Sequence, residues 1–524
     1  MYEMIDVVIV GGGPVGLFLA CELKLAGVDP VVLERLPEQS QDDKAHGVVG
    51  QAVRLLDDRG LYERFGGSGA PEPLPTFYFG TLTLPVHVLG DDNPMFMLQI
   101  NQRDLERLLA ERAAELGVDV RRGHEVLKFA QADDHVDLVV AGPDGAQENL
   151  SARFLVGCDG GHSEVRKQAG IAFPGIVDER VVSRGAIIGA TEQIRPVPGG
   201  RVAIDGFGEI SGYFHRTERG VVLIAFLDPE HPFITTLEWE DHPVGSYPGP
   251  GAPMTFEELE ASVERVLGVR VALSAPPEGS PALLRRICGR NTRLAERYRD
   301  RRVFLAGDAA HVHAASGGPG LNLGLQDAAN LAWKLAADLH GWAPGGLLDS
   351  YEPERRALGE RVFTQTQSQT ALMAPGSAVT ALRELFTELL AKRENVRLIA
   401  DLMAGVDVRY DMGEPEPADA TGWFAPRLDL TTEDGRKLRL AELRRDARPL
   451  LVDLSAGAAL AEAASPWSDR VARVAARAAT PSAPSLLIRP DGYVAWSGTD
   501  PAGLRGALGR WFGTAKKAPW RPNG

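Results

Sequence analysis

The sequence predicts an α/β protein in which a parallel sheet is interrupted by an antiparallel sheet and followed by a small α/β module. Three observations predict this architecture. A strand, a glycine-rich turn and a helix open the chain, alternating apolar residues fill its middle, and a stretch rich in Pro, Gly and acids precedes the last strands. At 524 residues, the chain is long enough for several domains.

The first strand leads directly into a turn that is typical of dinucleotide-binding proteins. The strand spans Asp6 to Val10, and the turn is Gly11-x-Gly13-x-x-Gly16. The first glycine permits a tight turn, the second lets the backbone approach a pyrophosphate, and the third lets the helix pack closely on the strand. Pro14 suits the first helical turn, where its missing N–H would have no partner. The pattern predicts phosphates at the N-terminus of the helix that continues from residue 17 to residue 25.

The second strand ends in an acidic residue at the expected place. Val31 to Leu33 form a buried strand that ends at Glu34, and Arg35 follows it in the same predicted site. A carboxylate there is placed to accept hydrogen bonds from an adenosine ribose. This context argues against a βαβ unit with a purely structural role, and it leaves FAD and NAD as alternatives.

The next segments predict two helices and a second strand-to-helix turn. Residues 51–65 and 100–118 have the apolar spacing of amphipathic helices. A buried strand from Phe154 to Cys158 ends at Asp159, and two glycines follow it. Ser163 is placed to cap a short helix that runs to residue 170.

The middle of the chain changes in texture. From about residue 172 to residue 280 the apolar residues alternate as in antiparallel strands, with the turn "TERG" between two of them. This inserted sheet is the expected wall for a substrate. The strand Val303 to Ala306 then returns to the first domain, and a helix with a buried apolar stripe begins at Leu321.

The last part of the chain predicts a separate α/β module. "GEPEPADATGWFAP" has the composition of a linker, and "RPLLVDLS" and "PSLLIRPDGYVAW" have the pattern of buried strands. The two strands of the second stretch would be joined by the turn "RPDG".

Composition excludes several classes of protein. A net charge of −15 disfavours nucleic-acid binding, and no apolar run reaches the length of a membrane helix. The three cysteines, Cys21, Cys158 and Cys288, form no closely spaced pair, so no disulfide framework, metal site or redox dithiol is expected. A cytoplasmic setting follows as the default.

Three stretches together resemble one family. The turn 11–16 with Glu34, "CDGGHSEVR" at 158–166 and "LAGDAAHVHAASGGPGLN" at 305–322 are similar to the three fingerprints of the FAD-dependent aromatic hydroxylases typified by p-hydroxybenzoate hydroxylase, which are class A flavoprotein monooxygenases. The resemblance covers residues 5 to about 370. The tail is similar to the C-terminal domain of a subgroup that includes aromatic polyketide hydroxylases and rifampicin monooxygenases.

The resemblance implies a domain order. A Rossmann-like FAD-binding domain would comprise residues 1–171 and, with connecting helices, residues 281–405. An antiparallel-sheet substrate domain would be inserted at 172–280, and a thioredoxin-like domain would occupy 406–524.

The resemblance also implies which residues hold FAD. The ADP half would lie on the first glycine turn, Asp308 would accept a hydrogen bond from the ribityl chain, and the first amides of the helix near Leu321 and Asn322 would meet the pyrimidine edge of the flavin. A helix N-terminus stabilises the anionic reduced flavin there. The implied FAD-binding residues are Gly11, Gly13, Pro14, Gly16, Glu34, Arg35, Lys44, Gln102, Val126, Asp159, Gly160, Asp308, Pro319, Gly320, Leu321 and Asn322.

Three residues near the expected flavin ring differ from the family pattern. Lys44 and Gln51 stand where the family usually has arginine, and lysine keeps the charge without the planar fork of arginine. His46 lies on the segment expected beside the isoalloxazine, where the subgroup tends to have an apolar residue. It is the single candidate for a catalytic side chain, because no acid–base constellation is visible in the sequence.

The implied chemistry is aromatic oxygenation. NAD(P)H would reduce FAD, O2 would add to form a flavin C4a-hydroperoxide, and its distal oxygen would pass to an electron-rich, polyketide-like aromatic substrate. Hydroxylation, epoxidation and ring-opening oxygenation remain alternatives, as do biosynthesis and drug inactivation. A halogenase is disfavoured because the stretch G-W-x-W-x-I-P is absent, and a dithiol reductase because no dithiol is present. A non-catalytic FAD carrier or sensor is the alternative function.

Overall fold

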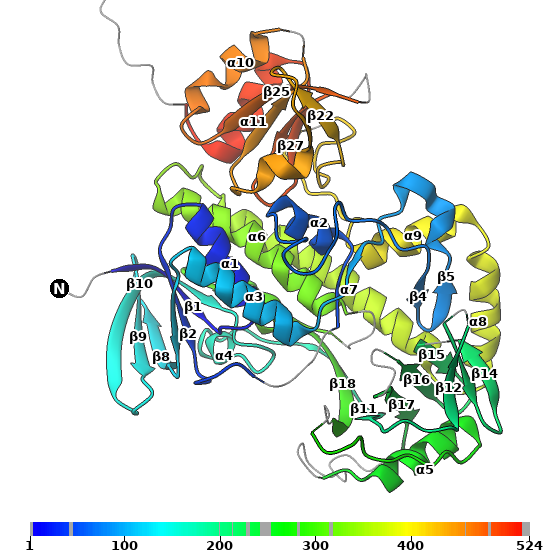
Figure 1. Ribbon diagram of the computed structural model, residues 1–524. Coiled ribbons are helices and arrows are strands. Elements are labelled where there is room, and N and C mark those ends of the chain that lie inside the picture. The colour runs from blue at the N-terminus through cyan, green and yellow to red at the C-terminus, as the bar shows by residue number, and fades with distance from the viewer. Residues whose placement is uncertain are drawn as a thin grey trace, which may run out of the picture.

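The computed structural model describes residues 4–40, 46–198, 200–211, 213–226, 231–241, 253–279, 283–313, 318–414, 416–455, 457–479 and 484–515. Figure 1 shows three regions: a nucleotide-binding domain in the centre, an antiparallel sheet with helix α5 (Phe256–Leu267) at the bottom, and a C-terminal module at the top. The α/β class predicted from the sequence is confirmed.

The central sheet has four neighbouring parallel pairs. Strand β1 (Ile5–Val10) lies between β10 (Gln147–Gly157) and β2 (Pro30–Glu34). The parallel part is completed by β20 (Val303–Leu305) beside β10 and by β7 (Asp119–Arg122) beside β2. Strand β19 (Arg299–Asp300) pairs antiparallel with β20, and β8 (Glu125–Gln131) and β9 (Val136–Ala141) form a hairpin that continues from β10. The chain returns at β20 to the sheet that it began, as predicted.

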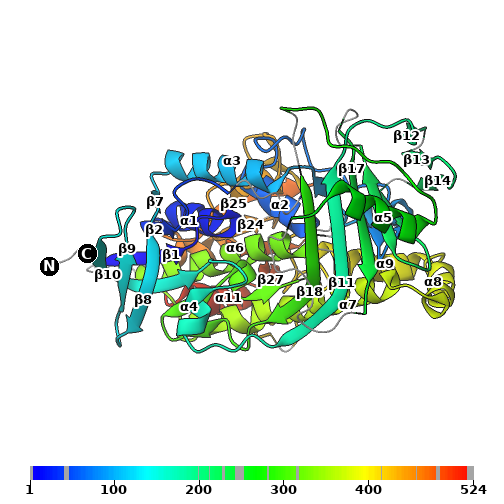
Figure 2. The same cartoon turned by 90° about the horizontal axis from the view of Figure 1, so that it is seen from below.

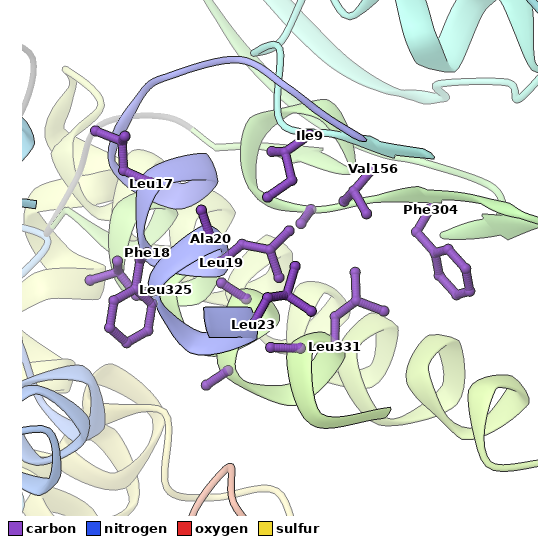
Figure 3. Packing of buried hydrophobic residues seen from close by; sticks show 14 of the residues in the cluster. Ile9, Leu17, Phe18, Leu19, Ala20, Leu23, Val156, Phe304, Leu325 and Leu331 are labelled. Carbon is purple, nitrogen blue, oxygen red and sulfur yellow. The ribbon is translucent and has the colours of Figure 1, made fainter. Parts of the chain in front are cut away.

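Strands β1, β2 and β20 are mostly apolar and buried because helices cover the centre of the sheet. Helix α1 (Pro14–Leu25) packs on α6 (Pro319–Leu339) and on α3 (Gln102–Glu115). Figure 3 shows side chains of α1 and α6 meeting side chains of the strands, among them Ile9, Leu19, Val156 and Leu331. Full burial of one such side chain contributes roughly 1.5–3 kcal/mol, so this cluster holds the two ends of the nucleotide-binding domain together.

The helix predicted at 51–65 is shorter in the structure. Helix α2 spans Gln51–Asp58, and Gly60, with φ of 68°, ends it. Helix α4 spans Glu164–Gln168, and the Oγ of Ser163 accepts a hydrogen bond from the backbone N–H of Arg166, as the predicted cap requires. The remaining elements of this region are β3 (Val48–Val49), β4 (Phe77–Phe79), β5 (Leu82–Leu84), β6 (Met97–Leu98), α7 (Tyr351–Met373), α8 (Ser377–Leu389) and α9 (Arg393–Ala404).

The inserted sheet is antiparallel and has the order β15-β16-β17-β11-β18-β21. Its strands are β15 (Tyr213–Arg216), β16 (Val221–Ala225), β17 (Phe233–Trp239), β11 (Gly175–Ile187), β18 (Leu284–Leu294) and β21 (His311–Val312), and a small sheet of β12 (Ile194–Val197), β13 (Arg201–Ile204) and β14 (Gly208–Ser211) lies beside it. The turn "TERG" joins β15 and β16, since Thr217 N–H donates to Gly220 O. Strands β18 and β21 follow residue 280, so the sheet extends past the predicted domain boundary.

The C-terminal module contains a six-stranded mixed sheet in the order β23-β22-β25-β24-β26-β27. Its elements are β22 (Asp429–Thr432), β23 (Lys437–Arg439), β24 (Leu450–Asp453), α10 (Ala459–Ala464), β25 (Ala472–Ala478), β26 (Ser485–Ile488), β27 (Val494–Gly498) and α11 (Pro501–Phe512). Strands β24 and β25 are parallel, whereas β26 is antiparallel to both of its neighbours. A thioredoxin-like topology for this module stays a prediction.

A buried cluster of charges joins the module to α6 and α7. The Arg489 guanidinium donates two hydrogen bonds of 2.7 Å to the Glu354 carboxylate and also pairs with Asp491. Lys334 Nζ donates to the same carboxylate at 2.7 Å. The guanidinium carbon lies 4.6 Å from the ring centre of Trp511, which adds a cation–π contact. The buried charges are therefore paired across the boundary between the two domains.

Within the ranges described above, no helix combines the length and the apolar character that crossing a membrane would require.

Replacing Arg489 with Met tests this junction. The variant leaves Asp491 and Glu354 buried with too few cationic partners, so we expect a loss of about 3–5 kcal/mol in unfolding free energy, measured by urea denaturation. Arg436→Met is the control, because the Arg436 side chain is 72% exposed and pairs with the similarly exposed Asp434. A loss no larger than that of the control would contradict this account of the junction.

Candidate active site

The first glycine turn has the geometry of a phosphate-binding loop. Gly11 has φ of 111°, and a Cβ there would overlap the carbonyl oxygen of Cys158. A Cβ on Gly16 would overlap the carbonyl oxygen of Gly11, because α1 starts directly against β1. Apart from its chain neighbours, no described residue has an atom within 4 Å of a Cβ built on Gly13, the N-cap residue of α1. The turn is closed on the protein side and open at Gly13, where a phosphate can reach the free amides and the positive end of α1.

Glu34 is held in one orientation at the end of β2. Its Oε2 accepts a hydrogen bond from Gly12 N–H at 2.7 Å, and its Oε1 accepts one from Leu36 N–H at 2.8 Å. A carboxylate oxygen has a second lone pair, so each oxygen retains capacity for a ribose hydroxyl. Arg35 is exposed beside it.

Gln102 and Val126 lie on elements that flank this turn. Gln102 is the first residue of α3, and Asn101 caps the helix by accepting a hydrogen bond from Asp104 N–H at 2.7 Å. Val126 is buried on β8, next to an irregularity in the pairing of β8 with β9.

Asp159 carries the clearest sign of a ligand. Its Oδ2 accepts hydrogen bonds from the N–H groups of Glu164 and Val165, at 2.8 and 3.1 Å. Its Oδ1 is buried and has no hydrogen-bond partner among the described residues. Burial raises the pKa of this carboxyl. A buried acceptor without a partner is costly, so this oxygen is suited to a hydroxyl group of a bound molecule. Gly160 follows with φ of 82° and open space around its Cα.

Asp308 lies at the end of β20, in a short 3₁₀ turn over Gly307–Ala309. A Cβ on Gly320 would be 3.6 Å from Asp308 Oδ1, so this carboxylate lies over the first turn of α6. Gly318 caps α6 with φ of 64°, and Pro319 occupies the first helical turn. The carboxyl end of a parallel strand and a helix N-terminus therefore meet at Asp308, which is the usual place for a ligand in such sheets.

The side chain of Asn322 is used within the protein. Its Oδ1 accepts a hydrogen bond from Val49 N–H at 2.8 Å, and its Nδ2 donates to Gly318 O at 2.7 Å. Asn322 thereby connects the first turn of α6 to β3. What it and Leu321 can offer to a cofactor is the backbone of the helix start.

The two glycine-rich stretches, almost three hundred residues apart in the sequence, lie against each other. A Cβ on Gly324 would be 2.6 Å from Val15 Cγ2, and a Cβ on Gly307 would be 3.0 Å from the same atom. Val15 therefore fits between Gly307 and α6 only because both neighbours lack a side chain. The starts of α1 and α6 are brought together at one edge of the central sheet (Figure 1).

A buried ion-pair cluster beneath the starts of α1 and α6 was not predicted from the sequence. Asp327, on α6, accepts hydrogen bonds from His311 Nε2 at 2.6 Å, Arg355 Nε at 2.8 Å and Gly307 N–H at 3.0 Å. Burial alone would raise the pKa of Asp327, but the positive field of His311 and Arg355 lowers it overall. The sequence signal for this cluster is Asp327 itself, an acidic residue among the apolar residues of the predicted helix.

The two described residues that were expected near the flavin ring and differ from the family pattern have opposite exposure. His46 is exposed, and Gln51 is buried at the start of α2. Lys44 and Gly317 lie outside the described residues. No group of three or more His, Cys, Asp and Glu side chains in the described part of the chain could hold a metal ion.

These observations fit an extended dinucleotide cofactor. The open Gly13, the unpartnered oxygen of Asp159 and the carboxylate of Asp308 over a helix start are groups that FAD can use along its length. They define a flavoprotein of the Rossmann-like class.

Comparison with known proteins identifies the family. Residues 4–366 match the family described as "FAD binding domain", and residues 418–515 match "Aromatic-ring hydroxylase, C-terminal". The chain belongs to the FAD-dependent aromatic-ring hydroxylases, and its cofactor is FAD.

Among its relatives is the 12-dehydrotetracycline 5-monooxygenase/anhydrotetracycline 6-monooxygenase of Streptomyces rimosus, 41% identical over 97% of this chain and 99% of the relative. The rifampicin monooxygenase of Rhodococcus hoagii is 36% identical over 98% and 99%. Among solved structures, the anhydrotetracycline hydroxylase from Streptomyces rimosus has a TM-score of 0.84 at 38% identity and covers 98% of this chain and 100% of its own. Aklavinone-11 hydroxylase with FAD and aklavinone has a TM-score of 0.74 at 25% identity, with coverage of 98% and 100%.

Two glycine variants separate cofactor binding from folding. Gly13→Ala places a Cβ in open space, so we expect an apoprotein stable to within about 0.5 kcal/mol of the wild type. Its affinity for FAD should fall by about tenfold or more, since the Cβ keeps the pyrophosphate from the amides. Gly16→Ala should instead destabilise the apoprotein by about 1–3 kcal/mol through overpacking. FAD titration by fluorescence and thermal unfolding measure the two effects, and equal effects of both variants would contradict the assignment.

Proposed function

We propose that this protein uses NAD(P)H and O2 to oxygenate a large polycyclic aromatic substrate, of the aromatic polyketide kind, beside a bound FAD. The observation that carries the proposal is the convergence of the two glycine-rich turns with Asp159 and Asp308 at one edge of the central sheet. FAD, when bound, accepts a hydride from the nicotinamide and activates O2. The protein contributes binding, orientation and exclusion of water.

The cofactor would be held by residues at the starts of two helices and at the ends of three strands. The amides of the turn at Gly13 would bind the pyrophosphate, and the Glu34 carboxylate would accept a hydrogen bond from a ribose hydroxyl. Asp159 Oδ1 and Asp308 would accept hydrogen bonds from hydroxyl groups of the ribityl chain. The start of α6 at Leu321 and Asn322 would meet the flavin pyrimidine. The positive end of α6 would stabilise negative charge on the reduced ring.

The inserted sheet would bind the aromatic substrate on one face. Glu258 of α5 receives hydrogen bonds from Arg184 and Arg286, so α5 covers the face on which these two side chains lie. Helix α5 contacts β11, β16 and β17, and Figure 2 shows it over this part of the sheet, whereas α7 contacts β18. The opposite face therefore turns toward the rest of the molecule, and we call it the open sheet face.

One part of the open sheet face is buried against α7, where Met373 packs on Val181 and Leu237. The other part is apolar and half-exposed, which suits a flat aromatic ligand. Its half-exposed or exposed side chains are Phe214, Leu223, Phe233, Thr235, Trp239 and Ile287. Near its centre the hydroxyls of Ser183 and Thr235 lie 3.2 Å apart. Apolar walls with a few polar groups are typical of small-molecule sites.

The relatives support a substrate of this size. The names of the similar proteins contain anhydrotetracycline, rifampicin and aklavinone, which are large polycyclic compounds. In each case the similarity covers nearly the whole chain. The relatives named here are monooxygenases or hydroxylases, so nothing in the comparisons supports a non-catalytic FAD carrier. The nicotinamide cofactor would bind transiently, since no second G-x-G-x-x-G turn follows a strand in the sequence.

The test of function is a coupled oxidation assay. We expect purified holoenzyme to oxidise NADPH slowly alone and at least tenfold faster with a polycyclic phenol such as anhydrotetracycline. In an atmosphere of ¹⁸O2, mass spectrometry should find one labelled oxygen atom in the product. A protein that binds no FAD, or whose NADPH oxidation responds to no aromatic ligand, would overturn the proposal.

A charge on the open sheet face tests the substrate site. Ile287 is 48% exposed there, and Ile287→Arg should raise the KM for the aromatic substrate about tenfold or more, because the ligand must then desolvate a guanidinium. The basal NADPH oxidation should stay within twofold of the wild type. Leu127→Arg is the matched control, since Leu127 is a 40% exposed aliphatic residue on the distant β8. Equal KM values for the two variants would place the substrate elsewhere.

A further inference from the structure

We propose that Tyr493, in the C-terminal module, is a positioning residue for the flavin-side segment 46–51, on which it acts through the Gln51 amide. The inference rests on the proposed function. Segment 46–51 is the segment that the sequence resemblance places beside the flavin ring. The inference gives the C-terminal module a part in oxygenation, although that module carries none of the proposed cofactor contacts.

The direct link is a buried hydrogen bond between the two domains. Gln51 is 1% exposed, and its Nε2 donates to Tyr493 Oη at 3.0 Å and to Gln326 Oε1 at 3.2 Å. Gln326 lies on α6, one turn beyond Asn322, and its Nε2 donates to Asn322 O at 3.2 Å. The amide of Gln51 thus connects the C-terminal module to the first turns of α6.

Segment 46–51 depends on such contacts for its position. Val49 N–H donates to Asn322 Oδ1 at 2.8 Å, and Gly50 N–H donates to Phe96 O at 2.9 Å. Gly50 has φ of 62°, and a Cβ there would be 2.5 Å from the Cα and the carbonyl oxygen of Ala404. The segment is therefore pressed between α6, β6 and α9, and Gln51 is the residue where it enters helix α2.

Tyr493 is a rigid anchor for this link. Its ring stacks on the ring of Tyr410 with centroids 3.8 Å apart and planes 15° apart, and Phe424 meets it edge-on at 5.7 Å. The Tyr493 side chain is buried, and burial raises the pKa of its hydroxyl, so the hydroxyl is neutral at physiological pH. It offers the Gln51 amide a fixed acceptor.

The tyrosine pair also connects to the other side of the cofactor site. Arg355 donates from its Nη1 to Tyr410 Oη at 2.8 Å and from its Nε to Asp327 Oδ1 at 2.8 Å. Asp327 in turn accepts from Gly307 N–H, next to Asp308. Two separate chains of hydrogen bonds thus run from the Tyr410–Tyr493 stack to segment 46–51 and to the turn of Asp308.

A structural role alone does not account for this chemistry. Aromatic and aliphatic side chains of the module, Trp496, Trp511, Phe512 and Leu508 among them, already pack in one cluster with Trp333 and Leu323 of α6. Burying an amide and a phenol in such an interface has a desolvation cost and fixes one relative position of the two groups. The gain is a defined place for Gln51, and hence for the segment before it.

Tyr493→Phe is the test, made on the FAD-loaded enzyme. The variant removes one hydroxyl and keeps the ring stack, so FAD should remain bound. We expect the visible absorption bands of the flavin to shift by several nanometres, and the ratio of oxygenated product to NADPH consumed to fall at least threefold, with the difference recovered as hydrogen peroxide. Gln51→Met should produce the same two changes, and it also removes the bond to Gln326. The double variant should not exceed Gln51→Met, because that substitution already breaks the bond to Tyr493.

Tyr298→Phe is the matched control. Tyr298 is fully buried, and its hydroxyl has no hydrogen-bond partner among the described residues. This variant should leave the spectrum and the product ratio as in the wild type.

Three results would overturn the inference. They are a Tyr493→Phe holoenzyme with wild-type spectrum and product ratio, effects of Gln51→Met and Tyr493→Phe that add in the double variant, and equal effects of Tyr298→Phe. If Tyr493→Phe does not fold, Gln51→Met decides alone by the same two readouts. If the wild type binds FAD but oxygenates no aromatic, the proposed function fails, and the shift of the flavin spectrum still decides the inference.

Discussion

The close approach of α1 and α6 is the constraint on which the rest of this structure depends. Val15 occupies the space left by the missing side chains of Gly307 and Gly324, so the N-termini of the two helices point to one edge of the sheet. Each helix start supplies free amides and a positive dipole end. FAD is a molecule long enough to use both, which explains why a single cofactor unites segments far apart in the chain.

The electrostatics of the site follow from this packing. Bringing β20 and α6 together buries Asp327, and the protein neutralises it with His311, Arg355 and the amide of Gly307. The same carboxylate thereby fixes the turn that presents Asp308. Buried charge acts here as a means of holding a backbone in place.

The inserted sheet and the C-terminal module are also attached to the central domain near α6. Strand β21, three residues beyond Asp308, pairs with β18 of the antiparallel sheet, so the proposed cofactor edge and the proposed substrate wall share one stretch of chain. The module contacts α7 through the bond between Arg489 and Glu354, and it contacts α6 through the bond between Asp491 and Asn330. The inserted sheet thus contacts the turn before α6, and the module contacts α6 itself.

The sequence alone determined the local features of this protein. Glycines at fixed spacing, a proline at a helix start and an acid at a strand end are read from neighbouring residues, so the turn at 11–16, Glu34 and the Ser163 cap were predictable. The end of α2 at Asp58, the membership of β18 in the inserted sheet, the Asp327 cluster and the Gln51–Tyr493 bond were decided by the tertiary structure. Each of these depends on contacts between residues far apart in the chain, and periodicity within a segment carries no information about such partners.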